Sequence, residues 1–189
     1  MKLYVCCLNL LMALMILPAN AYSTTIMEEK AETIIERAEF VVSATVIDIT
    51  ARLENDVPFE YITIKVKEIH KQDGAIEILE GDELPIRLMG GEVDGKKLVI
   101  EGRPQFVKDE DVLVALKLAE SGFFYVAGNV QGLYHVAGDK LINDTAETNA
   151  MFVRKGDKGQ VSFEAPVVEQ KTISQMKAMI KKVAEESTR

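Results

Sequence analysis

Cysteine, tryptophan and histidine are scarce in this chain, and their scarcity limits what the protein can do. Of its 189 residues, two are cysteine, two are histidine and none is tryptophan. Cys6 and Cys7 both lie in the first 21 residues, which have the pattern of a secretory leader. We therefore expect the remaining 168 residues to contain no thiol and no disulfide. A chain of that length can bury about 70% of its unfolded surface without such a link.

The leader has three parts. Lys2 gives a positive start, the stretch Leu3–Leu17 is uncharged, and Pro18–Ala21 places small residues at the two recognition positions. This pattern predicts a signal peptide over residues 1–21, with cleavage between Ala21 and Tyr22. The apolar stretch is too short for a membrane span, which needs about 20 apolar residues. We expect the mature protein to be periplasmic or secreted, and the lack of cysteine favours a bacterial periplasm.

Acidic residues outnumber basic ones. The chain has 30 aspartates and glutamates against 22 lysines and arginines, a formal net charge of −8 that becomes −9 when Lys2 leaves with the leader. Phosphate backbones and anionic lipid heads repel such a protein, and no basic stripe alternates with aromatic residues. Binding to nucleic acid is therefore disfavoured. No second long apolar segment follows the leader, so we expect no membrane span in the mature chain.

Motifs for catalysis, metals and cofactors are missing as well. The chain contains no Gly-x-Ser-x-Gly, His-x-x-x-His or Cys-x-x-Cys, and His70 and His135 lie in different expected strands. The acidic run Asp109–Asp111 lacks the central glycine of a calcium loop, and Gly90-Gly91 leads into a strand instead of the helix of a phosphate loop. We predict no catalytic residue, no cofactor and no metal. A pair of carboxylates that folding brings together is left open.

A helix is expected at each end of the mature chain. Apolar side chains recur at helical spacing over about residues 26–38 and again over about residues 173–186. Each segment begins at a candidate capping box, formed by Thr25 with Glu28 and by Thr172 with Gln175. Both helices are interpreted as packing on the core of the domain.

Between these helices the sequence alternates as strands do. The segments 40–50 and 61–70 are long and rich in valine and isoleucine, and each changes phase part of the way along, near Ile47 and near Ile69. A phase change predicts a β-bulge or a sharp bend. Two long strands that bend midway are what a small, strongly coiled barrel needs. Residues 55–58 between them are expected to form a loop.

Shorter strands follow along the chain. Asp94-Gly95 predicts a two-residue hairpin, Pro85 predicts an edge strand because proline cannot donate to a ladder, and the segment 112–118 should be the most buried strand. The expected fold class is mainly β (α+β): one domain over residues 22–189, with a barrel over about residues 40–164 and a helix on either side. The other strands are expected at 76–79, 85–88, 97–100, 123–127, 133–136, 140–142, 152–155 and 160–163.

One part of the chain has a sharper pattern. It combines Gly90-Gly91 before the hairpin, the turn Gly102-Arg103-Pro104-Gln105-Phe106, and Gln131-Gly132-Leu133-Tyr134 between two strands. In these elements the chain resembles a family of uncharacterised exported bacterial proteins with a Gly-Gly loop, a Gly-x-Pro-x-Phe turn and a Gln-Gly-aromatic element. The resemblance covers about residues 40–136 and implies no established activity. The chain departs from it at Lys108-Asp109, where a glycine commonly precedes the acid.

The order of a helix, the strand FVVSATVIDI and the strand YITIKVKEIHK is also similar to the netrin-like modules of metalloproteinase inhibitors. Those modules are five-stranded barrels of the OB type, so the similarity implies a partly closed, OB-like antiparallel barrel with a helix packed against it. The inhibitors bind the protease metal through an amino-terminal cysteine. The mature chain would begin at Tyr22 without any cysteine, so that mechanism is not expected here.

The function predicted from these features is binding or assembly without catalysis, in an exported bacterial system. The partner is expected to be a protein, a peptide or a glycan of the cell envelope. The expected contact surface combines glycines, which allow close approach, with residue types that anchor interfaces: Gly90, Gly91, Glu92, Arg103, Phe106, Gln131 and Tyr134. An alternative is that the glycines only serve tight turns. The competing function is an exported hydrolase that uses carboxylates such as Glu92, Asp94 and Glu101.

Overall fold

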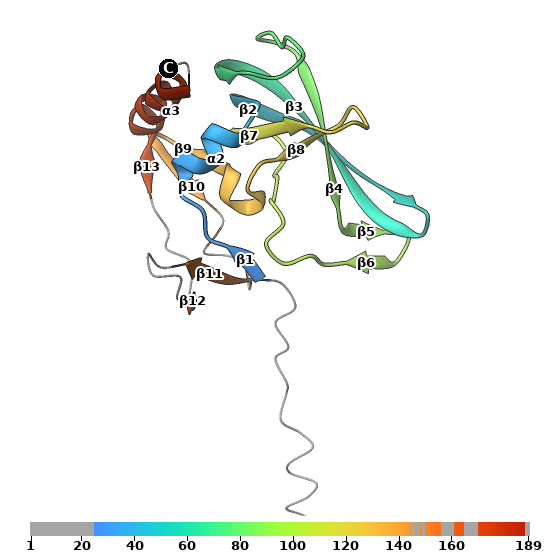
Figure 1. Cartoon of the computed structure of the whole chain (residues 1–189). Coiled ribbons are helices and arrows are strands. Elements are labelled where there is room, and N and C mark those ends of the chain that lie inside the picture. Colours follow the sequence, from blue (N-terminus) through green and yellow to red (C-terminus); the bar gives the residue numbers. More distant parts are fainter. Residues whose placement is uncertain are drawn as a thin grey trace, which may run out of the picture.

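The structure is a computed structural model that describes residues 25–143, 145, 148, 150–155, 161–164 and 170–187. The expected signal peptide and its cleavage site at Ala21 and Tyr22 lie outside these residues. Within them the fold is mainly β, as the sequence predicts, with a large ring-shaped sheet, two smaller sheets and two α-helices (Figure 1).

Five strands form a barrel. β2 (Phe40–Glu54) pairs with β3 (Val57–Gln72) and with β7 (Asp111–Leu118), and β3 pairs with β4 (Glu83–Met89). The ring closes through β8 (Phe124–Val126), which is antiparallel to β7 and parallel to β4. The order β7-β2-β3-β4-β8 and back to β7 makes a partly closed, OB-like barrel, in which β4 with β8 is the one parallel pairing.

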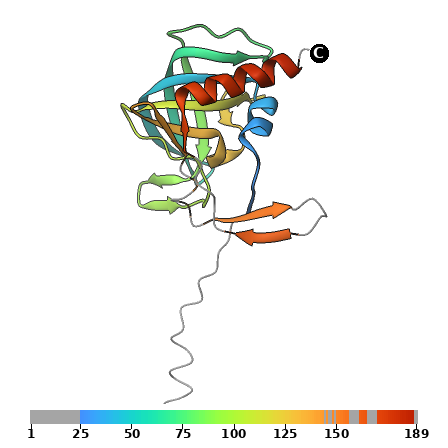
Figure 2. The ribbon, with the colours of Figure 1, turned by 90° about the vertical axis from the view of Figure 1, so that its left-hand side faces the viewer.

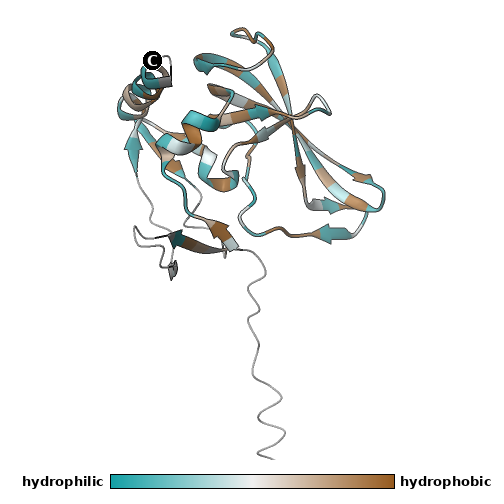
Figure 3. Cartoon of the chain, viewed as in Figure 1, coloured by the Kyte–Doolittle hydropathy of each residue, from teal (hydrophilic) through white to brown (hydrophobic). Residues whose placement is uncertain are grey.

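β2 and β3 coil around the barrel because their pairing is bulged. Its register shifts at three places, between Val41 and Val42, between Ser43 and Ala44, and between Val46 and Asp48. Ile47 and His70 lose their partners at two of these shifts, which confirms the phase changes expected near Ile47 and Ile69. Along both strands hydrophobic and hydrophilic residues alternate (Figure 3). The bulges add the local twist that lets a small barrel close.

Two hairpins use the same kind of turn. Asn55 and Asp56 alone connect β2 to β3, with φ of 48° and 67°, where the sequence suggested a loop over residues 55–58. Two consecutive positive φ angles match the twist of the flanking strands, and asparagine and aspartate tolerate such angles. The predicted Asp94-Gly95 hairpin is confirmed, with φ of 50° and 75°. It joins β5 (Gly91–Val93) to β6 (Lys96–Leu98).

One strand prediction is wrong, and another holds only in part. Residues 76–79 form no strand, and Ile78 instead packs into the barrel core, where it is 2% exposed. β4 is an edge strand only in part, because β3 lies along its whole length and β8 pairs with it at Ile86 alone. The Gly90 N–H donates to the Pro58 carbonyl, so the N–H and C=O groups of Gly90 point toward β3. Successive residues of a strand point these groups to opposite sides, so every second residue, beginning with Met89, points them away from β3. Pro85 is one of these, and its missing N–H therefore costs no bond to β3.

β7 is buried on both faces, as predicted. Val114 and Leu116 point into the barrel and Leu113 and Ala115 point outward, and all four are at most 3% exposed. The outward residues contact α2 (Ala31–Arg37) and α3 (Ile173–Ser187), which lie over this face of the barrel (Figure 2). Since both faces are covered, neither parity of the strand carries the usual polar residues.

The N-terminal helix is shorter than predicted. Thr25–Met27 form β1, which runs parallel to β11 (Met151–Lys155), and the helix α2 begins only at Ala31. Lys30 precedes the helix and makes no side-chain cap, so the capping box expected at Thr25 is absent. Pairing with a strand more than 120 residues away has overridden the local helical pattern, because β1 buries Ile26 against β11.

The C-terminal helix agrees with the prediction. The Thr172 N–H donates to Gln175 Oε1 at 2.9 Å and the Gln175 N–H donates to Thr172 Oγ1 at 3.2 Å, the reciprocal bonds of a capping box. Neither helix of the described residues is long and apolar enough to cross a membrane. The remaining elements are η1 (Asn129–Gly132), β9 (Leu133–Ala137), β10 (Lys140–Asn143), β12 (Val161–Glu164) and β13 (Lys171–Thr172).

We expect Leu116→Ala to lower the free energy of unfolding by about 2–5 kcal/mol, since it empties a fully buried site on a central strand. Val99→Ala is the matched control, because Val99 is 64% exposed and should change stability by less than about 0.5 kcal/mol. Denaturant unfolding followed by circular dichroism measures both. A loss below about 1 kcal/mol for Leu116→Ala would contradict the position of β7 in the barrel.

Candidate functional site

The barrel has an open seam where β4 meets β8. β8 has three residues and pairs with β4 at one position only, Ile86 with Phe124. Beyond this pair, residues 87–89 keep β3 on one side, and the described residues place no strand on the other. After β8 the chain turns at Gly128 into η1, so the two walls of the seam separate.

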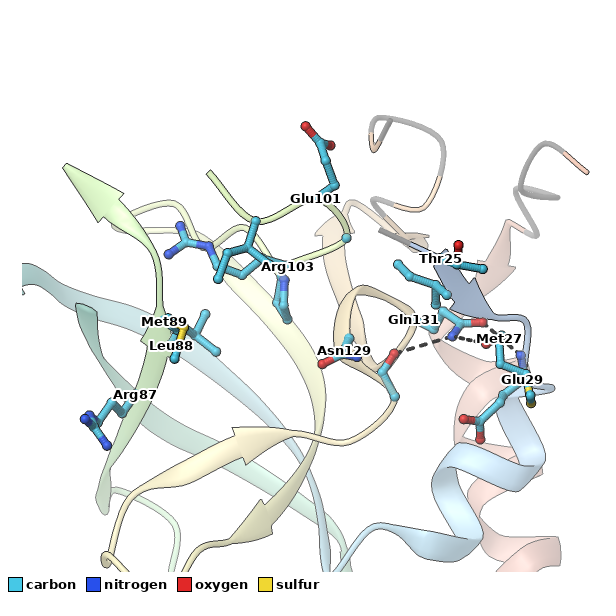
Figure 4. Close-up of a pocket in the computed structure, with 15 residues that line it drawn as sticks. Thr25, Met27, Glu29, Arg87, Leu88, Met89, Glu101, Arg103, Asn129 and Gln131 are labelled. Carbon is cyan, nitrogen blue, oxygen red and sulfur yellow. Dashed lines mark hydrogen bonds between the residues drawn. The ribbon is translucent and has the colours of Figure 1, made fainter. Parts of the chain in front are cut away.

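A pocket of about 450 Å³ lies in this seam (Figure 4). Leu88 and Met89 of β4 lie on one side of it, and Asn129 and Gln131 of η1 lie on the other. β1 and residues 100–104 complete the walls. The described residues that line the pocket include no aromatic one, and their apolar surface comes from aliphatic, methionine and proline side chains.

Gln131 ties β1 to this wall. Its Nε2 donates to the Met27 carbonyl at 3.0 Å, and its Oε1 accepts a hydrogen bond from the Glu29 N–H at 2.9 Å. One carboxamide thus satisfies two backbone groups on the same edge of the chain, as a neighbouring strand would. Gln131 is 7% exposed, and its two hydrogen bonds hold β1 against η1 at the wall of the pocket.

A partly buried ion pair lies next to the pocket. Arg103 Nη2 donates to Glu60 Oε2 at 2.8 Å, and the two side chains are 11% and 22% exposed. Two glycines leave room for this pair. A Cβ on Gly90 would lie 3.3 Å from Arg103 Nη1, and a Cβ on Gly91 would lie 2.8 Å from Glu60 Oε1. Both glycines also have positive φ, of 109° and 113°.

The structure brings together part of the predicted contact surface. Arg103 and Gln131 line the same pocket, and Gly90 and Gly91 lie against the Arg103–Glu60 pair. Glu92 is exposed on β5, away from the residues that line the pocket.

The other two predicted residues lie elsewhere. Phe106 packs against the barrel core, and Tyr134 packs with α2 and α3 on the outer face of the sheet. The predicted surface is therefore not continuous through Phe106 and Tyr134. Their alternation within short strands and turns does not indicate which of the two cores each one joins.

Sequence reasoning missed several residues that shape the pocket. Met27 and Met89 are 61% and 49% exposed, and Glu60 holds Arg103. Met27 lies in the segment 26–38, which the sequence predicts to be helical, but in the structure it belongs to β1. Glu60 has the parity of the inward residues of β3, and a charged residue at such a position is a signal that sequence alone offers.

The outer face of β3 and β4 carries an ordered polar and aromatic network. Glu54 accepts hydrogen bonds from the Tyr61 hydroxyl and from the Arg87 guanidinium. These bonds hold the pKa of Glu54 below its ordinary value, while the bond to Glu54 raises the pKa of Tyr61. Arg87 also stacks on the ring of Phe59 at 4.0 Å, and Arg52 stacks on the ring of Tyr61 at 5.0 Å. The guanidinium groups therefore cover the ring faces on this surface.

A second polar cluster lies beside α3. Ser43 Oγ lies 2.7 Å from His70 Nε2, His70 Nδ1 lies 3.6 Å from Glu68 Oε1, and Lys177 Nζ donates to both oxygens of Glu68 at 2.8 and 2.7 Å. Serine, histidine and carboxylate in this order have the arrangement of a catalytic triad. The His70 side chain is only 5% exposed, however, and none of the four residues lines the seam pocket. We interpret the cluster as a set of polar contacts that stabilise the packing of α3 on β3.

The described residues hold no group of three or more histidine, aspartate or glutamate side chains that could bind a metal ion. His70 contacts Ser43 and Glu68, whereas His135 Nδ1 lies 3.0 Å from Glu110 Oε2. Each histidine thus has its own carboxylate neighbour in a different part of the sheet.

We expect Gln131→Leu to lower the free energy of unfolding by about 1–3 kcal/mol, because it leaves the Met27 carbonyl and the Glu29 N–H without partners. Hydrogen exchange at the Glu29 amide should become faster. Gln105→Leu is the matched control, since the exposed Gln105 donates one weak bond, to the Arg103 carbonyl at 3.3 Å. Equal losses in the two variants would contradict the role of Gln131 in holding β1.

The pH dependence of stability should report on His70. Burial lowers its pKa below the ordinary value of 6.5, the Lys177 ammonium adds to this effect, and the Glu68 carboxylate opposes it. The unfolded chain therefore binds the proton first as the pH falls. The free energy of unfolding should decrease as the pH falls from about 6.5 toward the lowered pKa, by at most about 1.4 kcal/mol per pH unit, and this contribution should then level off.

Denaturant unfolding between pH 7.5 and pH 5 measures this effect. His70→Gln should flatten the decrease, whereas His135→Gln should retain it. The carboxylates with lowered pKa, Glu54, Glu68 and Asp111, have ordinary values of 4.5, 4.5 and 3.8 and titrate below this window. An unchanged slope in His70→Gln would show that His70 does not titrate differently in the folded chain.

Comparison with known proteins does not place the chain in a family. No protein-family model, no curated protein and no solved structure matches this chain.

Proposed function

We propose that this protein is a non-enzymatic binding module of an exported bacterial system, and that its ligand occupies the seam pocket. The observation that carries the proposal is the seam itself. A pocket of about 450 Å³ opens where the sheet lacks a strand, and exposed apolar side chains surround it. Met27, Met89 and Val99, which adjoins Ile100 of the wall, are 49–64% exposed. Concave sites with apolar walls and a few placed polar groups are where ligands bind.

The leader pattern and the acidic charge support the rest of the proposal. Residues 1–21 have the form of a signal peptide, so the module would act in the periplasm or outside the cell. A net charge of −8 disfavours nucleic acid and anionic membranes as partners. The partner is then a protein, a peptide or a glycan of the envelope.

The hydrolase alternative has less support. Of the three carboxylates considered for it, only Glu101 lines the pocket, while Glu92 and Asp94 lie on the exposed β5–β6 hairpin. A pair of acids that act on one bond must lie within about 5–10 Å of each other across the substrate. The position of the three acids gives no such arrangement inside the pocket.

Two probe sets test the proposed function: a displayed library of random peptides and an array of envelope glycans. We expect one of them to yield a ligand that shifts the amide resonances of Asn129 and Met89 and that Met27→Trp weakens at least tenfold by filling the pocket mouth. Lys181→Trp, on the exposed side of α3, is the control and should leave affinity unchanged.

Failure of both sets to yield a ligand at the pocket would overturn the proposal. A panel of chromogenic esters, peptides and glycosides provides the second test. Turnover that is lost in Glu101→Gln or Ser43→Ala would replace the binding module with an enzyme.

A further inference from the structure

The seam does more than leave a cavity, because it exposes the edge of a strand. We infer that the ligand of the pocket is an extended peptide that adds a strand to the free edge of β4 at Arg87–Met89. This inference rests on the proposed function, and it names the chemical class that the pocket selects. The first argument is the direction of the backbone groups along β4.

Alternate residues of β4 direct their backbone groups into the pocket. The Gly90 N–H donates to the Pro58 carbonyl at 2.9 Å, so Gly90 and Leu88 face β3 with their N–H and C=O groups. Arg87 and Met89 therefore face the other way. Among the described residues, no hydrogen bond outside the sheet ladders involves the Met89 N–H or the Arg87 C=O. These are the donor and acceptor that a further strand would use.

The added strand would lie on the side of β4 where β8 pairs with Ile86. β8 pairs with β4 at Ile86 and then turns away through Gly128, so no described strand lies beside Arg87–Met89 on this side. Three residues of a strand span about 10 Å. A segment of three or four residues in extended form therefore fits the free length of the edge.

The walls favour a neutral ligand with apolar side chains. Among the charged residues of the described pocket lining, Arg87 pairs with Glu54, Glu29 pairs with Arg37, and Arg103 pairs with Glu60 through Nη2. Arg103 Nη1 is buried without a hydrogen-bond partner, so one donor in the described lining is unused. Charges that already have partners offer little to a charged ligand. Five wall residues offer apolar contacts to side chains of the ligand: Ile26, Leu88, Met89, Ile100 and Pro104.

The same features argue against a glycan. Sugar rings bind best on open aromatic faces, and the part of the pocket lining that the structure describes contains no aromatic residue. On the adjoining outer face, guanidinium groups cover the rings of Phe59 and Tyr61. Backbone hydrogen bonds along an edge, with apolar contacts for alternate side chains, are the way in which sheets bind extended peptides.

The first experiment uses peptides selected from the displayed library and scans each one with N-methyl groups. Methylation removes one backbone donor at a time. We expect affinity to fall at least tenfold at every second position and less than threefold at the positions between, because alternate residues of a strand face the edge. Hydrogen exchange at the Met89 amide should slow on binding. A ligand that binds in the pocket without this period of two would overturn the inference and leave the proposed function standing.

The second experiment removes the donor from the protein. Met89→Pro deletes the N–H that faces the pocket and keeps every bond to β3, and Pro85 already occupies a position of the same parity in β4. We expect it to weaken peptide binding at least tenfold. Met89→Ala, which keeps the N–H, should weaken binding less than threefold. The unfolding curve of each variant checks that the barrel is intact. Thr63→Val on β3 leaves the backbone edge of β4 unchanged and serves as a second control.

A further outcome concerns a second copy of the chain. If the purified protein forms dimers that Met89→Pro dissociates, the occupant of the edge is another copy and the inference is wrong. If a glycan from the array occupies the pocket and no selected peptide does, the inference is also wrong, while the proposed function holds. Retention of full peptide affinity in a folded Met89→Pro variant would overturn it directly.

Discussion

The barrel depends on β8, a strand of three residues that must pair with β7 on one side and β4 on the other. Two glycines set its end. Gly128 has φ of 76°, which turns the chain, and a Cβ on Gly132 would lie 1.9 Å from the Ala127 carbonyl oxygen. A longer β8 would continue along β4 and fill the seam. The pocket therefore exists because the chain leaves the sheet as soon as the ring has closed.

The other side of the barrel is held by burial on both faces of β2 and β7. α2 has only seven residues and no side-chain cap at its start, so it depends on its contacts with the sheet. Lys71 supplies one of them. Its side chain is 2% exposed, it donates to the carbonyls of Glu36 and Ala38 at the end of the helix, and it pairs with Asp73 at 3.0 Å. A cation at the C-terminus of a helix also interacts favourably with the helix dipole. α2 and α3 therefore cover this face of the barrel, and neither contributes a residue to the described lining of the seam pocket.

Local signals predicted the fold where they did not compete with distant partners. The pattern of Thr172 with Gln175 and the turn at Asp94-Gly95 needed only neighbouring residues, and both were predicted correctly. Thr25 with Glu28 has a similar pattern and failed, because residues 25–27 pair with β11 across most of the chain. The phase changes of β2 and β3 pointed to a coiled barrel since a bulge leaves its mark on the alternation.

The candidate site was harder to predict for the same physical reason. Glycines beside an arginine suggested a contact surface, and Gly90, Gly91 and Arg103 do lie together. Nothing in the sequence indicates where β8 stops relative to β4, because that depends on register between strands about 40 residues apart. The free edge of β4 results from how β8 pairs with β4. The composition and periodicity of a single strand do not indicate where its neighbour stops.

Two strand edges border the pocket, and the chain treats them differently. The edge of β1 is covered by the Gln131 carboxamide, which takes the place of a neighbouring strand. Among the residues that the structure describes, none covers the edge of β4 at Arg87–Met89 in this way. An open edge invites pairing between whole sheets, and short length is one way in which proteins limit that risk. Here the open edge is three residues long and lies in a recess between η1 and residues 100–104. A broad sheet cannot enter such a recess, whereas a single extended segment can, so the same walls that protect the edge also select the peptide proposed to bind there.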